Sequence, residues 1–282
     1  MMPRAHAAVF GDPVAHSLSP AMHQAAYRAM GLPWRYLKIR VPRGDLAAAL
    51  RMADAARLRG VNLTIPLKEA ALPLMDRLTP AARRAGAVNT VTFGDGGVEG
   101  HSTDGEGFIR SLADAWRWQP RGARVVLLGA GGAARSVAFA LAAAGARRLV
   151  IMNRTSARAQ ELAARLRAAG EPGTAATPAD AAAWRTLLAG TDLLVNATSL
   201  GLHGEPSPVP AAALPRALRV ADLIYNPPST ALLRVARARG CRIVNGEGML
   251  VHQGALSLER WSGGRAPAEV MRRALRLELS RR

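Results

Sequence analysis

The sequence predicts an α/β protein of two domains, with the second domain inserted before a helical tail. Short apolar strands alternate with helical stretches over the first hundred residues. Near residue 105 the pattern changes to strand, glycine turn, alanine-rich helix and strand. With 282 residues the chain can form two modest domains, each with a core. We expect a first domain over 1–104, an inserted domain over 105–245 and C-terminal helices over 246–282 that pack on the first domain.

In the first domain, turn and cap residues separate the expected elements. Ser19 is a candidate N-cap followed by Pro20 at the favoured first helical position, and Gly31 ends that helix. Pro66 opens another helix, and the segment Gly94–Gly97 suggests a hairpin turn. The expected strands cover 6–11, 34–41 and 60–65, the helices 19–31 and 44–56, and the hairpin 87–103.

In the second domain, the segment 124–155 has the pattern of a βαβ unit. Continued alternation predicts further parallel strands joined by helices. The expected helices cover 156–169 and 230–239, and the strands 192–198, 220–225 and 241–245.

Composition excludes several classes of protein. No apolar run reaches the roughly 18 residues of a membrane span. The N-terminus lacks a signal-peptide pattern, and one cysteine, Cys241, rules out an internal disulfide or a Cys-rich zinc site. The six histidines show no HExxH spacing, so we expect no metal. A cytoplasmic protein that does not bind membranes is expected.

The formal charge of +18 raises the question of nucleic-acid binding. The arginines, however, are spread among alanines along the whole chain, and no nucleic-acid-binding motif accompanies them. We therefore expect no nucleic-acid partner. A positive field would still attract small anionic ligands.

A glycine motif predicts a dinucleotide site. The segment 129–134 has the form G-x-G-x-x-A, with Gly129, Gly131 and Ala134, between an apolar strand and a helix. Glycines let the backbone turn sharply and approach a pyrophosphate, which free N–H groups of the helix would bind. The alternative is a tight turn without a ligand.

The residues at the end of the next strand indicate which dinucleotide the site would bind. An NAD site usually has an acidic residue there for the ribose 2′-hydroxyl, but this chain has Asn153 and Arg154, with Arg158 one turn further. A guanidinium suits a 2′-phosphate, so NADP is favoured. Thr198 follows a strand at its C-terminal end, and we expect it near the cofactor without a role in chemistry.

Candidate substrate residues lie in the first domain. Ser17 and Ser19 place two hydroxyls at a helix N-terminus, where a carboxylate would bind, although Ser19 alone could be an N-cap. Asn62 and Thr64 alternate on one face of a strand.

Lys68 and Lys38 are the only lysines among 38 basic residues. Arginine stays charged, whereas lysine can release a proton, so Lys68 in the first turn of a helix is a candidate acid–base group. Asp104 is its candidate partner. The alternative for Asp104 is an ordinary first-turn acid beside a capping box of Thr103 and Glu106.

Taken together, the motifs resemble the shikimate dehydrogenase family. The resemblance follows the chain in order from about residue 10 to 263. It is carried by GDPVAHSLSPAMH, GVNLTIPLK, GAVNTV, STDGEG, GAGGAARS, NRT, NATSLG, DLIYNPPST and NGEGMLVHQG.

The resemblance implies NADPH-dependent, reversible reduction of 3-dehydroshikimate to shikimate, in a cleft between a substrate domain and a Rossmann domain. It implies that Lys68 and Asp104 are the acid–base pair. The implied substrate-binding residues are Ser17, Ser19, Asn62, Thr64, Asn89, Tyr225 and Gln253. The implied cofactor residues are Gly129, Ala130, Gly131, Gly132, Ala133, Asn153, Arg154, Thr155, Arg158, Thr198, Leu223 and Gly246. Of these, Leu223 and Gly246, together with Tyr225, match positions at the nicotinamide end.

Two alternatives remain open. One is a quinate/shikimate dehydrogenase that uses NAD. The other is a catalytically silent relative that binds NADP or shikimate. The expected assembly is a monomer or a homodimer.

Overall fold

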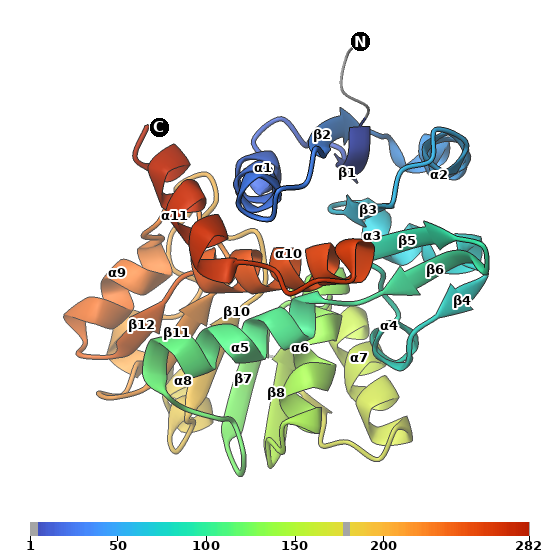
Figure 1. Ribbon diagram of the computed structural model, residues 1–282. Coiled ribbons are helices and arrows are strands. Elements are labelled where there is room, and N and C mark those ends of the chain that lie inside the picture. Colours follow the sequence, from blue (N-terminus) through green and yellow to red (C-terminus); the bar gives the residue numbers. More distant parts are fainter. Residues whose placement is uncertain (1–4, 177–180, 282) are drawn as a thin grey trace. The chain divides into compact units, whose positions relative to one another are not determined.

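The computed structural model describes residues 5–176 and 181–281, and the chain divides into two compact units (Figure 1). Unit 1 contains Met1–Gly107 and Leu250–Arg282, and unit 2 is Phe108–Met249. The chain leaves unit 1 within helix α5 (Asp104–Trp116) and returns to it within α10 (Glu247–Ser262). The boundaries therefore fall inside two helices, a few residues later than the sequence suggested.

Unit 1 contains a mixed sheet in the order β2-β1-β3-β5-β6-β4. Strand β1 is parallel to both β2 and β3, while β5 is antiparallel to β3 and β6. The expected hairpin is confirmed, because Gly94 pairs with Gly97. The strands are β1 (Ala5–Gly11), β2 (Arg35–Arg40), β3 (Gly60–Leu63), β4 (Arg77–Leu78), β5 (Thr90–Gly94) and β6 (Gly97–His101).

The helices of unit 1 cover an apolar core built on this sheet. Its centre includes Phe10, Leu63 and Val91. The C-terminal helix α11 packs on α1. The helices are α1 (Ser19–Ala29), α2 (Leu46–Ala55), α3 (Leu67–Ala70), α4 (Pro80–Ala85), α11 (Ala268–Leu279) and the 3₁₀ turns η1 (Arg43–Asp45) and η2 (Leu72–Leu74).

Unit 2 contains a parallel sheet in the order β12-β11-β10-β7-β8-β9. From β7 the chain adds strands outward on one side and then on the other, which is the order of a doubly wound dinucleotide-binding fold. The strands are β7 (Arg124–Leu128), β8 (Arg148–Met152), β9 (Thr174–Ala175), β10 (Leu193–Asn196), β11 (Arg219–Asp222) and β12 (Arg242–Val244).

Both faces of this sheet are buried. Val125 and Leu127 contribute to one apolar cluster, while Val126 and Leu128 contribute to the other. Residues 125–128 of β7 are all apolar and buried because helices cover each face of the sheet. These helices are α6 (Gly132–Ala143), α7 (Ser156–Ala168), α8 (Ala181–Leu188) and α9 (Ala231–Ala238), with the 3₁₀ turn η3 (Ala211–Ala213).

The helix expected after Pro66 is present as the four-residue α3. Other element ends differ from the expectation. Ser19 is the first helical residue rather than the N-cap, a position held by Leu18. The strand expected over 220–225 ends at Asp222, because its Oδ1 accepts the backbone N–H of Ile224 and the chain turns away from the sheet.

Within the described part of the chain, no helix is both long enough and apolar enough to cross a bilayer.

Candidate active site and cofactor site

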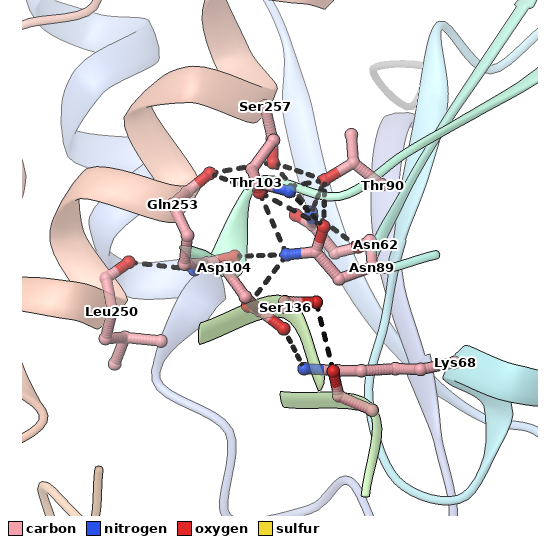
Figure 2. Close-up of polar contacts among 11 residues, drawn as sticks. Asn62, Lys68, Asn89, Thr90, Thr103, Asp104, Ser136, Leu250, Gln253 and Ser257 are labelled. Atoms are coloured by element: carbon pink, nitrogen blue, oxygen red, sulfur yellow. Dashed lines mark hydrogen bonds and ion pairs between the residues drawn. The ribbon is translucent and has the colours of Figure 1, made fainter. Parts of the chain in front are cut away.

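Lys68 and Asp104 form a buried ion pair in unit 1 (Figure 2). Lys68 Nζ lies 2.5 Å from Asp104 Oδ2, and the two side chains are 16% and 5% exposed. Lys68 comes from the short helix α3, and Asp104 is the first residue of α5. The pair thus joins two segments separated by the β5–β6 hairpin. It places an ammonium, which can move a proton, beside a carboxylate that holds it in position.

The second carboxylate oxygen of Asp104 is held by an amide. Asn89 Nδ2 donates to Asp104 Oδ1 at 2.9 Å, and also to Thr103 Oγ1 at 2.9 Å. Asn89 Oδ1 in turn accepts the backbone N–H of Thr103 at 2.7 Å. Both oxygens of Asp104 are therefore engaged, and its orientation toward Lys68 is fixed.

Gln253 connects this cluster to α10. Its Oε1 accepts from Asn89 Nδ2 at 3.3 Å, and its Nε2 donates to the carbonyl of Leu250 at 2.8 Å. The backbone carbonyl of Gln253 accepts from the Thr103 hydroxyl at 3.2 Å. Asn89, Asp104 and Gln253 are thus brought together, and their contact with substrate stays a prediction.

Asn62 belongs to a neighbouring network on β3. Its Nδ2 donates to Asn89 O, Thr90 Oγ1 and Ser257 Oγ at 2.9–3.1 Å. Its Oδ1 accepts from the hydroxyl of Tyr36 at 2.8 Å. Asn62 thus supports the sheet beneath the ion pair, and its contact with substrate stays a prediction.

Among the described residues, no side-chain hydrogen bond joins Ser17, Ser19 or Thr64 to the cluster around the ion pair. Ser17 Oγ accepts the backbone N–H of Ser19 at 3.3 Å, and Ser19 is 7% exposed. Thr64 is half-buried and follows β3, with its backbone N–H donated to Phe10 O at 2.9 Å. Their roles in substrate binding stay predictions.

His23 is a packed core residue and has no place in the acid–base chemistry. It is completely buried, and its ring stacks on Tyr36 with centroids 4.2 Å apart. Burial lowers the pKa of His23 to about 3, because the charged imidazolium would lose its hydration. The imidazole is therefore neutral at physiological pH.

In unit 2, the glycine turn after β7 provides space and free backbone donors. Gly129 has a φ of +113°, and a Cβ there would lie 2.8 Å from the carbonyl of Ala197. At Gly131 a Cβ would meet no atom within 4 Å, so a ligand could approach the backbone. Gly132 begins α6, whose N-cap Gly131 makes no side-chain capping bond. The N–H groups of this first turn therefore fit a pyrophosphate.

The segment after β8 carries exposed cationic side chains. Asn153 Nδ2 donates to the carbonyl of Thr155 at 3.0 Å, which shapes the turn into α7. Arg154 and Arg158 are exposed, and the first turn of α7 carries no acidic residue. This donor set fits a 2′-phosphate better than an unphosphorylated ribose.

Other predicted cofactor residues meet at the carboxyl ends of the unit 2 strands. Thr198 donates to Asn196 Oδ1 at 2.6 Å, directly after β10. Gly246 lies against the carbonyl of Leu223, so that any side chain at Gly246 would overlap it. Tyr225, predicted to bind substrate, is half-buried and belongs to unit 2, unlike the other predicted substrate residues.

Sequence reasoning missed the polar groups that position the site. Thr90, Ser257 and Tyr36 all contact Asn62. In the sequence, these residues are marked only as polar residues at inward-facing positions of a strand or helix. Such positions are too common to identify a functional site. Across residues 5–176 and 181–281, no group of three or more His, Cys, Asp or Glu side chains is arranged to hold a metal ion.

The glycine turn at the switch point of a parallel sheet, together with a buried Lys–Asp pair in a second α/β unit, defines a dinucleotide-dependent oxidoreductase. Family profiles identify it more closely. Residues 9–91 match the shikimate dehydrogenase substrate binding domain, 112–201 match shikimate / quinate 5-dehydrogenase, and 246–276 match the shikimate 5'-dehydrogenase C-terminal domain. The chain belongs to the shikimate dehydrogenase family.

Known proteins can be aligned with this chain over nearly its whole length. The NADP(+) shikimate dehydrogenase of Moorella thermoacetica is 48% identical over 271 residues, covering 95% of this chain and 92% of the relative. A solved Thermus thermophilus shikimate 5-dehydrogenase, in complex with NADP(H) and shikimate, is 41% identical with a TM-score of 0.86 and coverages of 97% and 99%. A quinate dehydrogenase of Corynebacterium glutamicum, in complex with NAD, is 32% identical with a TM-score of 0.87 and coverages of 96% and 98%.

Proposed function

We propose that this chain catalyses the reversible, NADPH-dependent reduction of 3-dehydroshikimate to shikimate, a step in the formation of aromatic amino acids. The observation that carries the proposal is the buried Lys68–Asp104 pair, with a separation of 2.5 Å. Membership of the family and the donor set after β8 support the substrate and the cofactor respectively.

The proposed mechanism uses Lys68 as the acid. Bound NADPH supplies the hydride that the ketone carbon receives. The carbonyl oxygen gains negative charge as this happens, and Lys68 donates a proton to it, so that a hydroxyl forms and a neutral amine remains. Asp104 holds the ammonium in place before transfer. In the oxidation direction, neutral Lys68 accepts the hydroxyl proton. General acid–base catalysis of this kind contributes roughly 10²–10⁴-fold.

In this proposal the other residues of unit 1 bind and orient the substrate. Ser17 and Ser19 donate to its carboxylate, while Asn89 and Gln253 meet its hydroxyls. In unit 2, the first turn of α6 binds the pyrophosphate, and Arg154 with Arg158 binds the 2′-phosphate.

A second candidate is a quinate/shikimate dehydrogenase that uses NAD. The likeness to the quinate dehydrogenase of Corynebacterium glutamicum favours it. The absence of an acidic residue at Asn153 and Arg154 favours NADP instead. A catalytically silent relative has less support, because Lys68 and Asp104 are both present and paired.

Initial rates of NADPH oxidation with 3-dehydroshikimate test the proposal, measured beside NADH and beside 3-dehydroquinate. Fast turnover with NADPH and 3-dehydroshikimate alone is the expected result. Comparable rates with NADH or 3-dehydroquinate would move the chain to the second candidate. Saturable NADPH binding without any turnover would favour the alternative of a catalytically silent relative that binds NADP or shikimate.

We propose a cytoplasmic location and an assembly no larger than a homodimer. The single cysteine, Cys241, is free, which suits a reducing compartment. Sedimentation equilibrium would measure the assembly directly.

A further inference from the structure

Tyr36 is a buried tyrosine whose position is fixed by ring packing. It lies on β2 and is 5% exposed, and its ring plane is 5° from that of His23. Trp261 closes the cluster, with its ring centroid 6.3 Å from that of Tyr36. Because these rings fix the Tyr36 side chain, its hydroxyl has a fixed place, 2.8 Å from Asn62 Oδ1.

The Asn62 amide can adopt one orientation in this network. One side of the amide faces the backbone carbonyl of Asn89 at 3.1 Å, and a carbonyl only accepts, so this side is Nδ2. Ser257 lies on the same side, and its hydroxyl proton is already donated to Gln253 O at 2.9 Å. Oδ1 therefore points toward Tyr36 and needs a donor.

The hydroxyl of Tyr36 consequently has a defined direction. Its single proton is donated to Asn62, so its oxygen is left to accept. Burial raises the pKa of Tyr36, and Ser19, which lies near this hydroxyl, acts against that larger effect and lowers the pKa. The bond connects Tyr36 on β2 to Asn62 on β3, and Ser19 on α1 lies near the same hydroxyl.

We propose that Tyr36 is a positioning residue of the substrate site, whose hydroxyl holds Ser19 and Asn62 in the orientations in which they meet the substrate. This inference rests on the proposed function, from which it takes shikimate as the ligand of those two side chains. Tyr36 itself does not contact the reacting atoms in this scheme. Its effect passes through Ser19 and Asn62.

Removal of the hydroxyl in Tyr36→Phe leaves Asn62 Oδ1, on a side chain 6% exposed, without the donor it has among the described residues. It also removes the hydroxyl near which Ser19 lies. We expect KM for shikimate to rise roughly 3- to 10-fold, the value of a hydrogen bond of this kind. The kcat should stay within about twofold, because Lys68 and Asp104 keep their contacts.

Tyr27→Phe is the matched control. Tyr27 lies in the same aromatic cluster, with its centroid 6.0 Å from His23, and is also fully buried. Its hydroxyl has no hydrogen-bond partner among the described residues. This variant loses the same atom from the same cluster without touching Ser19 or Asn62, so its KM should equal that of the wild type.

The test is the initial rate of shikimate oxidation with NADP⁺ for the wild type and both variants, with thermal unfolding to verify the fold. A wild type inactive with shikimate would overturn the proposed function. An active wild type with unchanged KM in Tyr36→Phe would overturn the positioning role alone, as would an equal rise in Tyr27→Phe.

Two further variants make the route of the effect measurable. In a Ser19→Ala background, the KM increase caused by Tyr36→Phe should shrink, because coupled residues are not additive. Full additivity would contradict a route through Ser19. Should Tyr36→Phe fail to fold, Asn62→Ala removes the side chain through which Tyr36 acts, and an unchanged KM there would overturn the inference.

Discussion

Asp104 binds two partners with its two carboxylate oxygens: Oδ2 meets Lys68 Nζ at 2.5 Å, and Oδ1 accepts from Asn89 at 2.9 Å. The amide therefore fixes the carboxylate, and the carboxylate fixes the ammonium. A pair this well buried is sensitive to the loss of either member, because the remaining charge would be left uncompensated. The predictions below follow from this arrangement and from the cofactor segment.

Lys68→Arg should keep the charge and lose the chemistry, because a guanidinium does not release its proton. We expect kcat to fall about 100-fold or more, while NADPH affinity stays within about twofold. Initial rates measure kcat, and a fluorescence titration with NADPH measures the affinity. Lys38→Arg is the control, since Lys38 donates to the carbonyl of Ala15 outside the site. Near-normal turnover of Lys68→Arg would refute the assigned role.

Asp104→Asn should lower kcat, although the new side chain has nearly the same size and shape as the old one. If the new amide oxygen keeps the bond to Asn89, its NH₂ group faces the Lys68 ammonium, and two donors meet. We expect kcat to fall at least about 10-fold. Asp114→Asn, an exposed position on the same helix, should leave kcat unchanged. Equal kcat values for the two variants would show that Asp104 is an ordinary first-turn acid.

Arg154→Ala should reduce the preference for NADPH over NADH. The substitution removes a charge-assisted bond between the guanidinium and the 2′-phosphate of NADPH. NADH has no 2′-phosphate, so its binding does not depend on this bond. We expect the ratio of kcat/KM values to fall about 10-fold. Arg165→Ala, in the last turn of the same helix, removes an equal charge and serves as the control. A ratio unchanged in Arg154→Ala would remove this residue from the cofactor site.

Stability should fall as the pH is lowered from about 6.5 toward 3. Burial lowers the pKa of His23 to about 3, so between these values the unfolded chain binds a proton that the folded chain does not. The contribution of neutral His23 to the free energy of unfolding is fully present above about pH 6.5. The free energy of unfolding should decrease by about 2 kcal/mol between pH 6.5 and 5. His101, whose pKa burial lowers to about 4, adds to the same slope.

Urea unfolding at pH 5, 6 and 7 measures this dependence. His23→Phe removes the titrating group and keeps an aromatic ring, so its stability should vary less with pH over that range. His203→Gln changes an exposed histidine and should keep the wild-type slope. A His23→Phe slope equal to that of the wild type would contradict the prediction.

Much of the fold could be predicted because its signals are local. The apolar strand before Gly129 and the alanine-rich helix after it identify the βαβ unit without any knowledge of distant contacts. Element ends were less certain. The side chain of Asp222 competed with the sheet for the backbone N–H of Ile224, and no periodicity reports such a competition.

The sequence by itself determined the order of strands and helices, the glycine turn and the presence of a lysine that can transfer a proton. The tertiary structure decided which polar groups meet. Tyr36 reaches Asn62 because β1 pairs with both β2 and β3, with Tyr36 opposite Ala7 and Asn62 opposite Val9. Asn89 reaches Gln253 because α10 returns to unit 1. Such contacts join segments distant along the chain, and only the packing of the whole unit sets their geometry.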